Sequence, residues 1–346
     1  MPNLTSVEKE FILMAEENNV SLVVLNIKGI SSFLYSSKKI LKVYKDLNFG
    51  LIIGWLYHGN LMAFLFKILT RSNAKLIWNI RSSLSAMKGA PFHRKIVINI
   101  SKHFSNKISA TIYNSKLSKQ EHIEYGFFSK QNSVINNGLD LDKFKPIPNA
   151  KEIICKELGI DNEDILVGMC ARFHKVKNFP LLIDAINKMH IKGRNISCIL
   201  CGDGVSMKNA TLAPLIKNTI RPKKFFLLGH RTDLPLIYSA LDLHLLTSNS
   251  ESASNSIIES MACGTICLSA DVGNSREILE DHQIFHPKDI ISLSEKLEDI
   301  LSIDPSDKVN DSSRTIIEGN FSSTAMNEEF TNLYKSIIGS DHSTHE

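Results

Sequence analysis

Short β-branched runs alternate with longer amphipathic stretches along this chain, a pattern typical of βα units built around parallel sheets. In the first half, such runs predict strands at 20–27, 50–55, 75–80, 109–113 and 133–135. In the second half, they predict strands at 165–171, 196–201, 224–228, 243–247, 265–269 and 283–286. We therefore expect an α/β protein with two doubly wound, Rossmann-like parallel-sheet domains that face each other across a cleft.

Turn residues indicate where the two domains meet. Asn137-Gly138 is a turn signal, and two prolines follow before a helix begins near Lys151. A last helix carries aromatic and aliphatic residues on one face and is expected to pack back towards the first domain. The predicted parts are an N-terminal domain over 1–148, a C-terminal domain over 149–320, the last helix over 321–338 and a disordered tail over 339–346.

The start of the chain is unusual for such a fold. Thr5 and Glu8 form a capping box that opens a helix through about Asn18, so no strand or glycine-rich loop precedes the first helix. In an open α/β sheet the first strand and its loop help to build the ligand crevice. We expect the first domain to lack its first strand, either because another segment replaces it or because the chain is shortened there.

Several features favour a cytoplasmic protein. The apolar stretch 51–70 has the length of a membrane span, but His58, Gly59, Asn60 and Lys67 interrupt it, so a buried strand turning into a helix at Gly59 fits better. Glutamates within the first twenty residues exclude a signal peptide. All six cysteines lie in apolar runs of the second half, which predicts buried free thiols in a reducing compartment.

The charge distribution differs between the halves. The composition, 43% hydrophobic and 22% charged, is that of an ordinary globular protein and excludes a disordered chain. Residues 1–150 hold 20 Lys and Arg against 9 Asp and Glu, whereas residues 151–346 hold 20 against 27. This asymmetry indicates either an anionic partner or membrane surface for the first half, or a solvated basic face without a partner. We expect no nucleic acid partner.

The most informative stretch follows the predicted strand at 243–247. Ser254, Asn255 and Ser256 open a helix there, and a helix N-terminus with free backbone N–H groups is suited to a phosphate. Glu251 precedes this helix and Glu259 lies about two turns inside it. The alternative interpretation is that both glutamates are solvated helix-end charges.

A second loop adds positive charge at the same edge of the sheet. Arg172 and Lys177 follow the predicted strand at 165–171, and the carboxyl edge of such a sheet is where ligands bind. A guanidinium and an ammonium stabilise the charge that grows on a departing diphosphate. Gly202-Asp203-Gly204 and His230-Arg231 lie in further loops of this edge, the former resembling a close-approach turn.

Taken in order, these motifs resemble glycosyltransferase family 4. The resemblance covers about residues 50 to 335, and its motifs are Gly138-Leu-Asp140 to Phe144, Arg172 to Lys177, Gly202-Asp-Gly204, Leu228-Gly229, Glu251-x7-Glu259, Met261-Ala-Cys-Gly264 and Asp271 to Glu277. It implies a GT-B fold and a retaining, metal-independent enzyme of the polysaccharide-biosynthesis type that uses nucleotide-sugars. No cofactor or metal is expected.

The resemblance also implies roles for individual residues. Arg172 and Lys177 match the pair that binds the donor diphosphate and assists catalysis, and Glu251 matches the catalytic carboxylate near the transferred sugar. Glu259 matches the residue that holds the donor ribose. The remaining donor-side candidates are Gly202, Gly204, Arg231, Ser254, Asn255 and Ser256. On the acceptor side the resemblance points to Arg81 and to His58, our further candidate for a catalytic residue.

The sequence departs from the family pattern at Ser252 and Ser254, where a glycine and a proline are usual. The resulting prediction is retaining transfer of a sugar from a UDP- or GDP-sugar to a hydroxyl of a lipid-linked saccharide, in bacterial O-antigen or capsule synthesis. The enzyme would work in the cytoplasm, in peripheral contact with the anionic inner face of the membrane. The alternatives are a GT-B sugar-nucleotide epimerase and a truncated, non-catalytic nucleotide-binding remnant.

Overall fold

The computed structural model describes Ile12, Met14, Ala15 and residues 17–22, 49–85, 91–302 and 311–339. The helix predicted from Thr5 and the strand predicted at 20–27 lie largely outside this range, as does the predicted tail beyond Gly339. The chain divides into two compact units, and one of them, Leu51–Phe66 with Lys75–Glu346, contains both sheets and the candidate site.

The first sheet has four parallel strands in the order β1-β2-β3-β4. These are β1 (Leu51–Trp55), β2 (Lys75–Ile80), β3 (Ala110–Tyr113) and β4 (Gln131–Val134). The associated helices are α3 (Leu56–Thr70), α4 (Phe92–Phe104), α5 (Lys116–Tyr125) and α14 (Ser323–Gly339), with the 3-10 helix η2 (Ser105–Lys107). Along β2, Leu76, Trp78 and Ile80 join the cluster with α3 and α4, whereas Ile77 joins the cluster with Phe330 of α14.

The second sheet has six parallel strands in the order β10-β9-β8-β5-β6-β7. These are β5 (Ile165–Cys170), β6 (Ile196–Cys201), β7 (Phe225–Gly229), β8 (Leu243–Leu246), β9 (Cys267–Ala270) and β10 (Ile284–Phe285). The chain runs outward from β5 to β7 and then returns to the other side of β5 with β8. Ligand crevices form at such a reversal of strand order, which here lies between β5 and β8.

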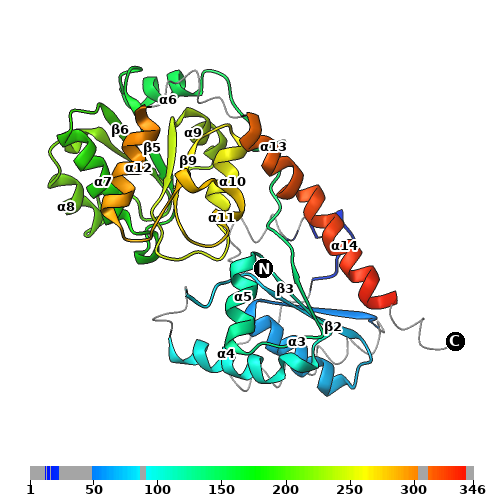
Figure 1. Cartoon of the computed structure of the whole chain (residues 1–346). Coiled ribbons are helices and arrows are strands. Elements are labelled where there is room, and N and C mark those ends of the chain that lie inside the picture. Colours follow the sequence, from blue (N-terminus) through cyan, green and yellow to red (C-terminus); the bar gives the residue numbers. More distant parts are fainter. Residues whose placement is uncertain are drawn as a thin grey trace, which may run out of the picture. The chain divides into compact units, whose positions relative to one another are not determined.

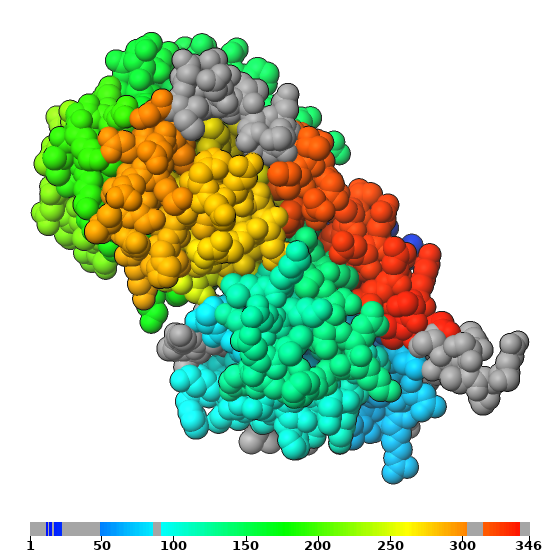
Figure 2. Space-filling view, viewed as in Figure 1, coloured from blue at the N-terminus to red at the C-terminus, as the bar shows by residue number. Residues whose placement is uncertain are grey.

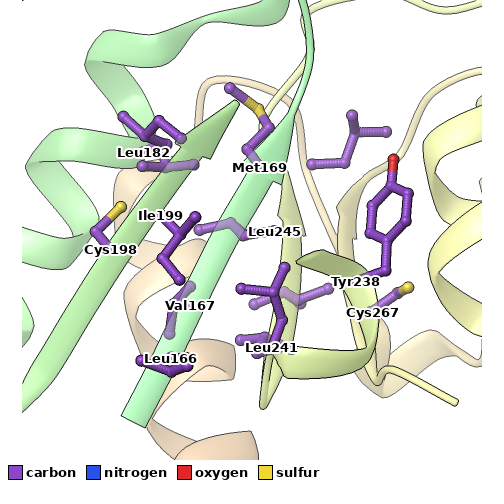
Figure 3. Packing of buried hydrophobic residues seen from close by; sticks show 14 of the residues in the cluster. Leu166, Val167, Met169, Leu182, Cys198, Ile199, Tyr238, Leu241, Leu245 and Cys267 are labelled. Carbon is purple, nitrogen blue, oxygen red and sulfur yellow. The ribbon is translucent and has the colours of Figure 1, made fainter. Parts of the chain in front are cut away.

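Helices cover both faces of this sheet, α7, α8 and α12 packing together and α9 packing with α10 (Figure 1). The bounds are α6 (Ala150–Leu158), α7 (Phe179–Ile191), α8 (Leu212–Lys217), α9 (Leu234–Ala240), α10 (Asn255–Ala262), α11 (Ser275–Ile278), α12 (Ile290–Ser302) and α13 (Asp311–Asn320). The short 3-10 helices are η3 (Lys175–Lys177), η4 (Pro222–Lys224) and η5 (Asp281–Gln283). Figure 3 shows part of the core of this sheet and its helices, with Val167 and Met169 of β5 beside Ile199 and Leu245 of the neighbouring strands.

The predicted fold class, two α/β domains built on parallel sheets, is confirmed, and most predicted strands differ from the observed ones by one or two residues. The start of one strand and the start of one helix differ from the prediction. The strand predicted at 265–269 is β9, which begins at Cys267 because the Thr265 hydroxyl and N–H bond to carbonyls of Tyr238 and Ser260 instead. The helix predicted at Gly59 begins at Leu56, whose left-handed φ of 60° turns the chain directly from β1 into α3.

Candidate functional site

A cavity of about 910 Å³ opens at the carboxyl ends of β5 and β8, where the strand order reverses. The loop after β5 contributes Arg172 and Lys177, and the loop after β8 contributes Glu251, followed by Asn255. Because the two loops leave the sheet on either side of the reversal, their side chains converge without a long connection. The sequence prediction that these two motifs share one edge is therefore confirmed in their geometry.

Lys177 and Glu251 form a close ion pair in this cavity. The Lys177 Nζ donates to Glu251 Oε1 at 2.6 Å, and the Ser248 hydroxyl donates to the same oxygen at 2.7 Å. The two side chains are 23% and 14% exposed, so water screens them only in part. Backbone bonds fix the two loops together, since the Asn249 N–H donates to the Val176 carbonyl at 2.7 Å.

Arg172 lines the same cavity as an exposed cation. Its loop packs against Gly202, which has φ +143°: a Cβ there would lie 2.2 Å from the Ala171 carbonyl oxygen and 2.8 Å from the Arg172 nitrogen. A Cβ at Gly204 would lie 3.2 Å from the Cβ of Phe173. These two glycines were predicted to contact the donor, but they do not line the cavity and instead support the loop that carries Arg172.

The N-terminus of α10 reaches the cavity through Asn255. The Asn255 Oδ1 accepts from the Asn137 Nδ2 at 2.6 Å, and the first N–H groups of any helix have no partner within it. Ser254 is the buried N-cap residue, and its N–H donates to Asn274 Oδ1 at 2.8 Å. Ser254 and Ser256 do not line the cavity, so only Asn255 of the three predicted capping residues is brought to it.

Glu259 lies inside α10 and outside the cavity lining. Its Oε2 accepts from the hydroxyl of the fully buried Tyr238 at 2.9 Å, and burial raises the pKa of the Glu259 carboxyl. Glu251 and Glu259 thus have different surroundings, since the first lines the cavity beside a lysine. The second, predicted to hold the donor ribose, lies outside the cavity lining beside a phenol.

Arg231 is held away from the cavity by two acids. Its guanidinium donates to Asp233 at 2.8 and 2.7 Å and to Glu157 at 2.5 and 3.2 Å. These contacts raise the pKa of Arg231 above its ordinary value. Arg231 was predicted to lie on the donor side of the site, but the structure does not bring it to the lining of the cavity.

On the side of the four-stranded sheet, Arg81 lies near two aromatic rings, Trp55 and Phe330, that stack on each other. Its Cζ is 5.3 Å from the centroid of the Trp55 ring and 5.5 Å from that of Phe330. Its Nη1 donates to the Ile135 carbonyl at 3.0 Å and to the Asn137 Oδ1 at 2.8 Å. Desolvation lowers the pKa of Arg81, which nevertheless stays far above neutrality as for any arginine. The cavity thus receives a second, aromatic-flanked cation from the predicted acceptor side.

His58 does not meet these groups. It is exposed in the first turn of α3 and is absent from the cavity lining, because the helix starts two residues before it and Trp55, at the end of β1, lines the cavity instead. Sequence reasoning missed Arg94 and Phe330 as lining residues. Phe330 was assigned to the packing face of the last helix, and Arg94 carries no local signal beyond its position in a basic region.

Within the described ranges, no group of three or more His, Cys, Asp or Glu side chains is arranged to hold a metal ion. In the same ranges, none of the helices combines the length and apolarity that a bilayer crossing requires.

Comparison with known proteins finds a family match in the half of the chain that carries Arg172 and Glu251. Residues 150–316 match the family model of glycosyl transferases group 1. This match includes the two loops that carry Arg172 and Glu251. The residues within the matched range that line the cavity follow β5 and β8 and open α10.

Two proteins from Escherichia coli are similar to this chain. O-antigen biosynthesis glycosyltransferase WclY is 26% identical over 229 residues, which is 64% of this chain and 61% of that protein. UDP-Gal:alpha-D-GlcNAc-diphosphoundecaprenol alpha-1,3-galactosyltransferase is 29% identical over 152 residues, 43% of this chain and 39% of that protein. The chain thus spans less than two thirds of the length of these relatives.

Solved structures share the two-sheet architecture. Anabaena Alr3699/HepE, determined in complex with UDP-glucose, superimposes with a TM-score of 0.79 at 20% identity, covering 94% of this chain and 89% of that one. A sucrose-phosphate synthase from Thermosynechococcus elongatus gives 0.75 at 17% identity, covering 92% and 82%. At such identities the likeness establishes the GT-B fold and nothing finer.

Proposed function

We propose that this chain is a retaining glycosyltransferase of family 4 that moves a sugar from a UDP- or GDP-sugar to a hydroxyl of a lipid-linked saccharide. The observation that carries the proposal is the convergence of Arg172, Lys177, Glu251 and the start of α10 in one cavity at the point where the strand order reverses. A diphosphate bridged to a sugar needs cations on its phosphates and a hydrogen-bond acceptor near the sugar, and this cavity offers both.

In the proposed reaction the bond between the anomeric carbon and the diphosphate oxygen breaks, through an oxocarbenium-like state. Negative charge grows on the leaving diphosphate, and Arg172 and Lys177 stabilise it from fixed positions. The acceptor hydroxyl forms the new bond on the same face and gives its proton to an oxygen of the leaving diphosphate, so that configuration is retained. Glu251 orients Lys177 and accepts hydrogen bonds from hydroxyls of the sugar being transferred.

The proposed acceptor is anionic and lipid-linked. Arg81 and Arg94 line the cavity on the side opposite the proposed donor cations, which suits a diphosphate on the acceptor. One relative acts, by its name, on a sugar diphosphate of undecaprenol, and another in O-antigen biosynthesis. A role in bacterial surface polysaccharide synthesis at the inner face of the cytoplasmic membrane follows from this acceptor.

The first test is a thermal-shift panel of UDP- and GDP-sugars with the full chain. A sugar nucleotide at about a hundred times its dissociation constant stabilises the protein by about 2.7 kcal/mol. The stabilising donor is then incubated with a synthetic sugar-diphosphate lipid, in buffer containing EDTA, and the anomeric configuration of the product is read by NMR. We expect a product with the donor's configuration.

Each other outcome contradicts a stated part of the proposal. Inverted product excludes the retaining mechanism, and a need for added divalent ions excludes metal independence. Conversion of the donor to its epimer without an acceptor favours the epimerase alternative, and binding without any turnover favours the non-catalytic remnant.

A further inference from the structure

Helix α4 presents an apolar row to solvent. Phe92, Ile96 and Ile100 follow one another at intervals of four residues, which places them on one side of the helix. They are 77%, 41% and 38% exposed, whereas Ile98 and Ser101 on the opposite side are buried. A soluble helix normally turns such a row towards the core, so this exposed row needs a partner.

Two further exposed side chains extend the row into one surface. Tyr125, at the end of α5, is 42% exposed and its hydroxyl donates to Asn99 Oδ1 of α4 at 2.8 Å. Phe128 is 61% exposed, and its N–H donates to the Ser105 Oγ just beyond α4 at 2.8 Å. We refer to Phe92, Ile96, Ile100, Tyr125 and Phe128 as the α4 surface. Figure 2 shows the cyan atoms of the α4 segment at the molecular surface.

The surroundings of the α4 surface are basic, apart from the exposed Glu124 of α5. No Asp or Glu occurs between Asp46 and Glu121, a stretch that contains eleven Lys and Arg residues. Lys95 is exposed beside the row, and the Lys102 Nζ lies 4.8 Å from the centroid of the Tyr125 ring. The acid that ends this stretch is Glu121. Its carboxylate accepts hydrogen bonds from the N–H groups of Leu84 and Ser85.

We propose that the α4 surface docks on an anionic phospholipid bilayer. A helix with exposed Phe and Ile along one side, lysines at its flanks and no acid suits the boundary between lipid headgroups and acyl chains. The lysines attract the anionic headgroups and the apolar side chains enter the boundary. A protein partner would require acidic groups matched to particular lysines, whereas a lipid surface requires only the sign of the charge.

Helix α4 connects the proposed membrane contact with the cavity. Arg94, in the first turn of α4, lines the cavity, and it lies half a helical turn away from Phe92 and Ile96. A helix is about 10 Å across, so a saccharide diphosphate held at the membrane surface is within reach of the cavity. This role in presenting the acceptor rests on the proposed function, but lipid binding can be measured independently of sugar transfer.

The test is flotation of the full chain with phosphatidylcholine vesicles that contain or lack phosphatidylglycerol. We expect binding only to the anionic vesicles, weakened by salt. Phe92→Ser/Ile96→Ser/Ile100→Ser is expected to lower partitioning at least about tenfold. Lys95→Glu/Lys102→Glu is expected to lower it by about fivefold or more for each lysine. The control variants lie on helices of the six-stranded sheet and are Ile291→Ser, where the side chain is 64% exposed, and Lys217→Glu. Both are expected to bind the vesicles like wild type.

Several results would overturn the proposal. These are no binding by the wild type, equal losses in the control variants with native thermal unfolding, or displacement from the vesicles by inorganic phosphate at fixed ionic strength. A wild-type dimer that the triple variant alone abolishes, with vesicle binding intact, would assign the α4 surface to a second copy of the chain instead.

Transfer assays separate this proposal from the proposed function. With a soluble acceptor analogue the triple variant should turn over like wild type, and with the same acceptor group anchored in vesicles it should be at least about tenfold slower. A wild type that binds vesicles but transfers no sugar contradicts the proposed function and leaves the docking surface standing. A wild type that transfers sugar without binding vesicles contradicts only the docking surface.

Discussion

Replacing Lys177 by methionine tests the proposed chemistry most directly, because it removes one charge and keeps the length of the side chain. The Lys177 side chain is 23% exposed, so an effective dielectric constant of about 20 applies, and a unit charge about 4 Å away then interacts by about 4 kcal/mol. Only the part gained as charge builds on the leaving diphosphate accelerates the reaction. We therefore expect Lys177→Met to lower kcat by about 10²- to 10³-fold, with a smaller change in KM for the donor.

The neighbouring lysine supplies the control. Lys175 belongs to the same 3-10 helix and is exposed, but it does not line the cavity. Lys175→Met should retain kcat within about threefold. The assay follows release of nucleoside diphosphate at saturating acceptor, over a range of donor concentrations. If Lys177→Met keeps more than about a third of the wild-type kcat, or if both variants slow equally, the assignment of Lys177 to the leaving group is wrong.

The ion pair offers a second explanation for a slow Lys177→Met variant, and Glu251→Gln separates the two. Removing the lysine leaves the 14%-exposed Glu251 carboxylate without its cation, and that charge could itself repel a diphosphate. If repulsion is the whole effect, the double variant recovers activity relative to Lys177→Met. If the lysine stabilises the leaving group, the double variant is at least as slow as Lys177→Met.

The sequence predicted the proposed donor half of the site better than the proposed acceptor half. Arg172, Lys177 and Glu251 belong to loops that follow two strands of one parallel sheet, so the order of the strands alone brings them to one edge. Arg231 also follows a strand of this sheet, but Asp233 and Glu157 hold its guanidinium. Asp233 is close to Arg231 in the sequence, but Glu157 comes from helix α6, and no motif encodes that contact.

The acceptor half depends on packing between distant segments. Arg81 acquires its setting from Trp55 at the end of β1 and from Phe330 of α14, which lie far apart in the sequence. His58 follows Trp55 closely, yet the left-handed residue Leu56 starts the helix early and leaves His58 outside the cavity lining. The turn is tight, since a Cβ at Gly54 would lie 2.6 Å from the Asn60 Cα.

Three further predictions test the supports of the site and the fold. Gly202→Ala should lower the unfolding free energy by at least about 2 kcal/mol in urea titrations, because its Cβ meets the Ala171 carbonyl at 2.2 Å, whereas Gly193→Ala, at φ +84° with open space, should cost about 1 kcal/mol. Tyr238→Phe removes the 2.9 Å bond to Glu259, which lies outside the cavity lining, and should lower the unfolding free energy by about 1 kcal/mol in the same titrations. His122 is buried with a pKa lowered to about 4, chiefly by desolvation, and its neutral ring accepts from the Tyr57 hydroxyl and donates to the Ser118 carbonyl, both at 2.6 Å. Because the unfolded chain binds this proton near pH 6.5, the stability that the neutral ring supports is complete above that pH and is lost as the pH falls towards 4. Between pH about 7.5 and about 5 this residue alone should remove about 2 kcal/mol, and an equal loss in His122→Gln would show that the acid sensitivity arises elsewhere.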